Sequence, residues 1–218
     1  MLNQIIGQDL SFWNVVVLII SYLAIILVAL PIHEWAHGFV ASKLGDPTPR
    51  MYGRLTLNPF AHLDIAGTLM LVVFGFGFAK PVPVDPRYFR KPRTGMVLVA
   101  LAGPLSNLIV AFLAAGAYRL LLLVNVGGMA TYLLAWFFFS GAHISISLAV
   151  FNLLPIPPLD GYRIISPLLP AKWTYYVNRY QMYATIAVLA LLATDALDIP
   201  LNFLRDLFSR LVFGVYGL

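Results

Sequence analysis

Residues 12–38 read FWNVVVLIISYLAIILVALPIHEWAHG, a long apolar run that ends in a group of polar side chains. The first 21 residues, Phe12–Ile32, carry no charge and are long enough as a helix to cross a hydrocarbon core of about 30 Å. His33 and His37 follow at i and i+4, so on a helix both rings project from one face and can bind one metal ion. Glu34, the only glutamate in the chain, lies about 100° further around the helix and can reach a metal-bound water.

The composition is that of a membrane protein. Of the 218 residues, 61% are hydrophobic and 11% are charged, whereas soluble domains are about 45–50% apolar and 25% charged. The net charge of +5 comes from basic residues beside the apolar runs, so we expect membrane lipid and no nucleic acid as a partner. The absence of cysteine excludes thiolate ligands and leaves His, Asp and Glu for metal binding.

The apolar runs predict an all-α polytopic membrane protein with about five to six spanning or re-entrant helices. We expect one domain over residues 1–218, with core motifs in 12–165 and C-terminal helices in 172–218. Further spans are predicted over Met96–Val124, Thr131–Leu154 and Trp173–Ala193. Ile65–Ala79 is short for a crossing and is predicted to be re-entrant, while the amphipathic Leu197–Tyr216 fits a surface helix or a short crossing. Arg50–Asn58 is predicted to form a small β-hairpin or strand after the first span.

Two polar groups in later spans are candidate site residues. Asn107 needs a hydrogen-bond partner in the bilayer, and a neighbouring helix could supply it. Three prolines, at 155, 157 and 158, end the span that contains Asn152 and hold Asp160 on an irregular segment. Asp160 could cap the helix that begins at Gly161 or bind a metal, and its local sequence fits both.

The distribution of charge predicts the orientation. Eight of the fourteen Lys and Arg residues fall within Lys43–Arg93, which places that stretch in the cytoplasm and the N-terminus outside. Counting spans from there brings Asp160 to the same side as His33 and His37. Two imidazoles and one carboxylate leave the fourth position of a tetrahedral zinc ion open for water, as in catalytic sites. The remaining histidines, His62 and His143, are predicted to be loop or packing residues.

The chain resembles the site-2 protease family of intramembrane metalloproteases in three ordered motifs. These are His33-Glu34-x-x-His37, Gly103-Pro104-x-x-Asn107 and Asn152-x-x-Pro155-x-Pro157-x-Leu159-Asp160-Gly161. The short chain is most similar to the compact branch of the family, which lacks PDZ and CBS domains.

The resemblance implies that His33, His37 and Asp160 bind one zinc ion and that Glu34 is the general base. It also implies that Asn107 and Asn152 lie near the site and contact the substrate or stabilise the oxyanion. The expected function is intramembrane proteolysis of a transmembrane protein, with the active site toward the cytoplasmic face of the cell membrane. The alternative is a metal-binding membrane transporter or an inactive scaffold that uses the same ligands.

Overall fold

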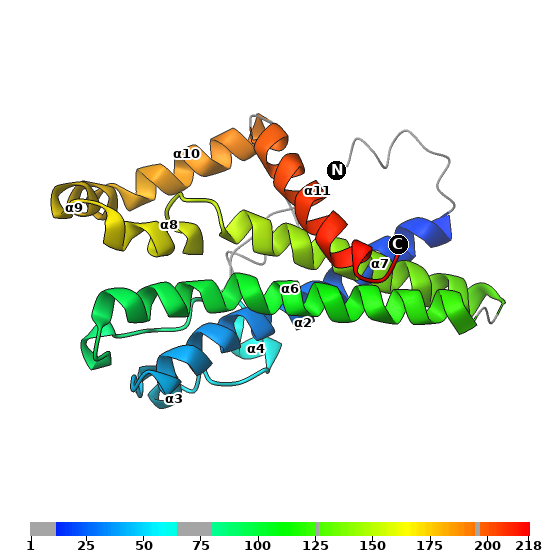
Figure 1. Cartoon of the computed structure of the whole chain (residues 1–218), viewed down its shortest axis with the longest axis horizontal. Helices are drawn as coiled ribbons and strands as arrows, with labels where there is room; N and C mark the ends of the chain where they lie inside the picture. The colour runs from blue at the N-terminus through cyan, green and yellow to red at the C-terminus, as the bar shows by residue number, and fades with distance from the viewer. Residues whose placement is uncertain (1–11, 65–79, 125–126, 195–196) are drawn as a thin grey trace.

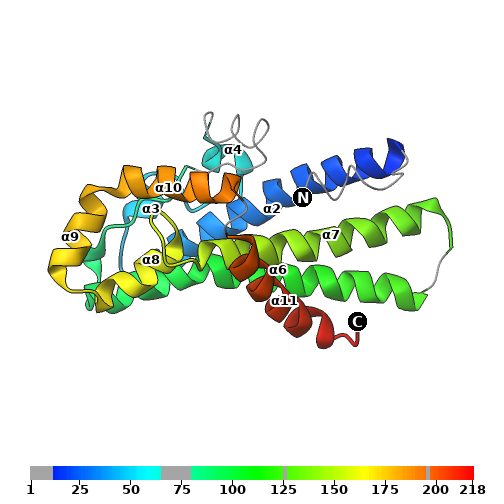
Figure 2. The same ribbon diagram turned by 90° about the horizontal axis from the view of Figure 1, so that it is seen from above.

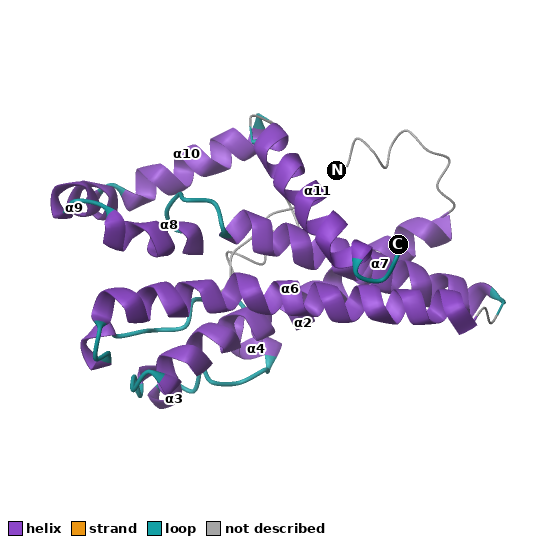
Figure 3. Ribbon diagram, viewed as in Figure 1, coloured by secondary structure: helices purple, strands orange, loops and turns teal. Residues whose placement is uncertain are grey.

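The structure is a computed structural model that describes residues 12–64, 80–124, 127–194 and 197–218. Its elements, in chain order, are α2 (Phe12–Lys43), α3 (Thr48–Met51), α4 (Pro59–His62), the 3-10 helix η1 (Pro86–Tyr88), α6 (Pro92–Val124), α7 (Met129–Asn152), α8 (Asp160–Ile165), the 3-10 helix η2 (Ser166–Leu168), α9 (Ala171–Arg179), α10 (Gln181–Ala193) and α11 (Asp198–Gly214). No strand longer than an isolated bridge at Leu63 occurs in these ranges (Figure 3). The described chain is therefore helical, as its apolar runs predict.

Three long helices form the centre of the molecule. Figures 1 and 2 show α6 and α7 side by side, with α2 along them and α11 packed on α7 and α6. Small side chains at the contact let the helices approach closely, as is usual where lipid surrounds a bundle. The buried cluster contains Ala111, Ala115, Ala142, Ile146, Val150, Leu154, Leu201, Val212 and Phe213.

Two of the described helices, α6 and α7, are long and apolar enough to cross a membrane. They have 33 and 24 residues, or about 50 and 36 Å at the usual rise per residue. They correspond to the spans predicted over Met96–Val124 and Thr131–Leu154. The run predicted to be the first span lies in α2, which continues through Pro31 to Lys43 and carries His33 and His37 in the same helix.

The predicted span over Trp173–Ala193 is not one helix. The structure divides it at Tyr180 into α9 and α10, because Tyr180 has φ −106° and ψ 19° and leaves the helical conformation. α10 has 13 residues, so at the usual rise it is about 20 Å long and too short to cross the hydrocarbon core alone.

The hairpin or strand predicted over Arg50–Asn58 does not form. Prolines 47 and 49 favour the start of a helix, and the chain makes the single helical turn α3 there. Gly53 then takes a left-handed conformation with φ 64°, and irregular chain leads to α4. The predicted re-entrant stretch, Ile65–Ala79, lies outside the described residues.

The chain between α7 and α8 is irregular, as its prolines predict. α7 ends at Asn152 and α8 begins at Asp160. Gly161 lies against the carbonyl oxygens of Leu153 and Leu154, and a Cβ at this position would overlap them. The missing side chain at Gly161 therefore lets the start of α8 fold back on the end of α7, which fixes the position of Asp160.

Candidate metal centre

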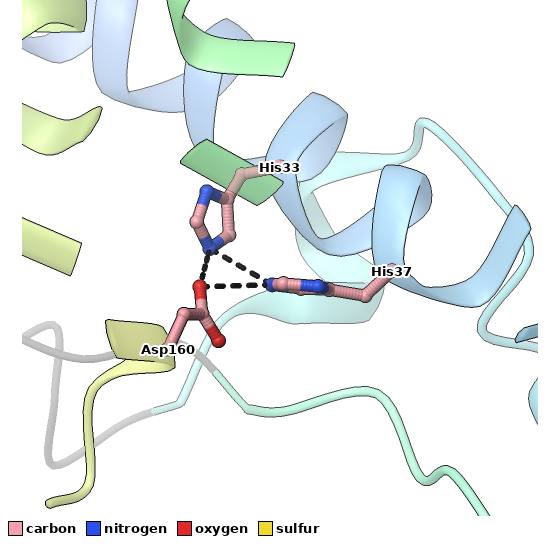
Figure 4. A group of neighbouring side chains, drawn as sticks. All are labelled: His33, His37 and Asp160. Carbon is pink, nitrogen blue, oxygen red and sulfur yellow. Dashed lines mark hydrogen bonds and ion pairs between the residues drawn. The ribbon is translucent and has the colours of Figure 1, made fainter. Parts of the chain in front are cut away.

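Two histidines and one aspartate meet in the structure, although the second histidine and the aspartate are 123 positions apart in the sequence. His33 and His37 project from α2, and Asp160 reaches them from the start of α8 (Figure 4). Oδ2 of Asp160 lies 3.1 Å from Nε2 of His33 and 3.2 Å from Nε2 of His37. The two Nε2 atoms are 3.1 Å apart, and the ring planes are at 88°.

All three side chains are buried. His33, His37 and Asp160 are 7%, 4% and 6% exposed, so their polar atoms depend on partners inside the protein. Among the described residues, the two imidazole nitrogens are the nearest polar partners of the Asp160 carboxylate.

A main-chain carbonyl fixes one imidazole from behind. Nδ1 of His37 donates a hydrogen bond to the carbonyl oxygen of Val99 on α6, over 2.7 Å. With its proton on Nδ1, His37 turns the lone pair of Nε2 toward Asp160, which is the tautomer that a metal ligand needs. The sequence does not indicate this role of Val99, because every residue has a main-chain carbonyl whatever its side chain.

The amide of Asn107 lies behind the other imidazole. Its Nδ2 is 3.1 Å from Nδ1 of His33, and the residue is 1% exposed. Nδ1 is the ring nitrogen that does not face Asp160. Asn107 thus finds its partner on a neighbouring helix, as predicted from its place in a span, and it contacts a candidate ligand from the side away from the cluster.

Gly103 creates the space for the two rings. A Cβ at this position would overlap ring atoms of both His33 and His37. α6 therefore passes directly over the imidazoles, and Val99, Gly103 and Asn107 contact them from successive turns of one face. Gly103 belongs to the second sequence motif, but its clearance from the rings is visible only in the structure.

The other predicted residues lie outside the three-residue cluster. Glu34 is half-buried, and its Oε2 accepts a hydrogen bond from the main-chain N–H of Val82 over 3.0 Å. Nδ2 of Asn152 donates to the carbonyl of Leu148, one turn back in α7. His62 hydrogen-bonds the carbonyl of Thr56, and His143 packs between two phenylalanine rings, Phe139 and Phe213.

The donor set fits one zinc ion. Nε2 of His37 and Oδ2 of Asp160 are both acceptors, and they converge with Nε2 of His33 in a buried space where no other described group donates a hydrogen bond to Oδ2. One nitrogen or oxygen atom from each residue can be chosen so that all three lie within 4.8 Å of one another. Two imidazoles and a carboxylate are typical of catalytic zinc sites, and a small movement of each side chain would open the set around an ion.

Comparison with known proteins gives consistent matches. Residues 120–194 match the family described as Peptidase family M50. The chain is 44% identical over 182 residues to "Putative zinc metalloprotease YwhC" of Bacillus subtilis, and the match covers 81% of this chain and 82% of that protein. Two mycobacterial proteins named Rip2 carry the same description. The one from Mycolicibacterium smegmatis is 31% identical over 205 residues and the one from Mycobacterium tuberculosis 32% over 202, each covering 88% of this chain and 72% of the relative. No solved structure matches the chain significantly.

Proposed function

Because this chain belongs to peptidase family M50, the site-2 protease type of zinc metalloprotease, we propose that it cuts transmembrane segments of other proteins inside the membrane. The observation that carries the proposal is the convergence of His33, His37 and Asp160 in a buried site between helices of a membrane bundle. The substrate enters as a helix whose carbonyls are bonded internally, so a short stretch must unwind before a peptide bond can reach the ligands.

The proposed roles follow from the chemistry of each side chain. Nε2 of His33, Nε2 of His37 and the carboxylate of Asp160 hold the zinc. When bound, zinc supplies Lewis acidity, which polarises the peptide carbonyl and makes a water more acidic. Glu34 accepts a proton from the attacking water and delivers it to the nitrogen of the peptide bond as the C–N bond breaks.

Asn107 is better placed to orient His33 than to contact a substrate. Metal binding through Nε2 requires the proton of His33 to sit on Nδ1, where it needs an acceptor. Rotating the Asn107 amide by 180° brings Oδ1 to this nitrogen. In the present orientation Oδ1 is buried and has no hydrogen-bond partner within the described part of the chain. We therefore assign Asn107 to the support of a ligand, and Asn152 remains a candidate for substrate or oxyanion binding.

The active site is proposed to face the cytoplasm. α2 runs toward, and α6 runs away from, the end of the bundle that carries the basic segments 43–54 and 80–93 (Figure 1). The opposite end, where α6 ends and α7 begins, has one charged residue, Arg119, in 119–124 and 127–138. By the positive-inside rule the basic end is cytoplasmic and the N-terminus is outside.

The test is a Glu34→Gln variant expressed in membranes beside the wild type. Gln is isosteric but does not take a proton, so we expect bound zinc to be retained and cleavage of transmembrane proteins to be lost. Mass spectrometry of membrane proteins from the two strains would identify substrates as cleavage products present only with the wild type. Full cleavage by Glu34→Gln would show that Glu34 is not the general base. A metal transporter or an inactive scaffold would yield no cleavage products with either protein.

A further inference from the structure

The proline-rich segment Lys80–Asp85 lies across the face of α2 that carries Glu34. Its main-chain N–H at Val82 donates to Oε2 of Glu34 over 3.0 Å, a contact between residues 48 positions apart. The side chain of Val82 is 6% exposed and packs over Gly38, one helical turn beyond Glu34. One residue of the segment therefore contacts α2 through both its main chain and its side chain.

Two other hydrogen bonds fix the ends of the segment. Lys80 donates its N–H to the carbonyl of His62 over 2.8 Å. Asp85 donates its N–H to Oδ2 of Asp46 over 2.8 Å, and Asp46 is 1% exposed. The segment is thus held at its first, third and sixth residues by three different parts of the chain.

Between Lys80 and Val84 the only main-chain N–H is that of Val82. Residues 81 and 83 are prolines, which have no N–H. Each proline also restricts the residue before it to extended conformations, which keeps Val82 from turning its N–H away by joining a helix. Within the described part of the chain, the other oxygen of Glu34, Oε1, accepts no hydrogen bond, so a water could approach it.

We infer that the Lys80–Asp85 segment positions the general base, with Val82 N–H holding one carboxylate oxygen of Glu34 so that the other faces the attacking water. Val82 is a positioning residue that acts through Glu34, and the inference rests on the proposed role of Glu34. Gly38 contributes by leaving room for Val82, because a Cβ there would lie 3.3 Å from Val82 Cγ1 and 3.3 Å from Pro49 Cβ.

The kinetic test compares Val82→Pro with Val82→Ala. Proline removes the N–H and keeps an apolar ring, whereas alanine keeps the N–H and removes the packing on Gly38. The substrate is a fusion protein in which one transmembrane helix joins two soluble reporter domains, reconstituted with the enzyme in liposomes. We expect Val82→Pro to lower kcat by about 10–100-fold, the usual effect of losing a supporting contact at such a site. KM and zinc content should not change, and Val82→Ala, which keeps the N–H, should lose much less activity than Val82→Pro.

Two outcomes would overturn the inference. Val82→Pro could be as active as Val82→Ala, or it could raise KM at unchanged kcat, which would make the segment a substrate-binding element. A Glu34→Gln enzyme that still cleaves would instead show that the proposed role of Glu34 has failed.

Hydrogen exchange tests the contact without activity and without changing Val82. Glu34→Ala removes the acceptor, and we expect exchange at Val82 N–H to accelerate about tenfold, since hydrogen bonds to charged groups are the stronger ones. Glu34→Gln keeps an acceptor oxygen and should show a smaller change, and Lys80 N–H, which is bonded to His62, should be unaffected. Equal exchange at Val82 in wild type and Glu34→Ala would refute the contact even if Val82→Pro failed to fold.

Discussion

Gly103→Ala should impair the metal centre much more than it destabilises the fold. The added Cβ would overlap ring atoms of His33 and His37. Restoring ordinary carbon contact distances requires a shift on the order of 1 Å of the rings or of α6. A misplacement of about 1 Å at reacting groups can cost roughly 100-fold in rate, and we expect a loss of that size in kcat.

The structure also sets the expected change in stability. Overpacking a close helix contact costs about 1–3 kcal/mol, while replacing glycine by alanine inside a helix returns about 0.5–1 kcal/mol. Gly103→Ala should therefore remain folded with a modestly lower melting temperature. Its zinc affinity should fall by about 10–100-fold because both imidazoles lose their alignment with Asp160.

Gly116→Ala provides a matched control on the same helix. A Cβ at Gly116 would meet the ring and the hydroxyl of Tyr216, at 2.9 Å from the oxygen, far along the chain from the ligands. We expect this variant to keep wild-type zinc affinity and cleavage. The assays are competition with a chelator for zinc, thermal unfolding by circular dichroism, and cleavage in liposomes. A folded Gly103→Ala with wild-type zinc affinity and kcat would refute the proposed alignment.

Three further predictions concern Asp160, Asn107 and Asp46. Asp160→Asn should lower zinc affinity at least tenfold because a neutral amide is a weaker ligand. Undiminished affinity in the chelator competition would show that Asp160 caps the helix and does not bind the metal. Asn107→Leu should lower zinc affinity about 10–100-fold by freeing Nδ1 of His33, whereas Asn107→Asp, which keeps an acceptor, should lose less; equal losses would contradict the orienting role. Asp46→Ala removes the acceptor of Thr48 N–H and Asp85 N–H, at 2.9 and 2.8 Å, and should reduce the free energy of unfolding by about 1–3 kcal/mol; an unchanged denaturation midpoint would contradict it.

The candidate metal ligands could be chosen from the sequence because their local pattern carries the chemistry. The i, i+4 spacing of His33 and His37 is a property of the helix alone, and the long uncharged run before them required that helix to be apolar. Asp160 was harder to assign, since a helix cap and a metal ligand look alike at the start of a helix. Its place beside the histidines followed from counting spans, and the coordinates bring the three side chains together.

The secondary-structure prediction was wrong where a stretch with prolines or a short apolar run is compatible with two local conformations. Arg50–Asn58 has the composition of a strand, but the prolines before it start a helical turn and Gly53 allows a left-handed turn. Trp173–Ala193 has enough apolar residues for one span, but the helix breaks at Tyr180. Local propensity does not distinguish these outcomes because contacts with other segments determine which one is the more stable.

The sequence by itself determined the class of protein and the chemistry of its candidate metal ligands. Apolar length, charge distribution and histidine spacing are local quantities, and they are the same before and after folding. Only the tertiary structure decided which groups contact the candidate ligands and Glu34: the carbonyl of Val99, the amide of Asn107, the space at Gly103 and the N–H of Val82. A main-chain N–H or carbonyl, or the absence of a Cβ at a glycine, cannot be assigned a role from residue type. These roles become visible only when α6 and the Lys80–Asp85 segment pack against α2.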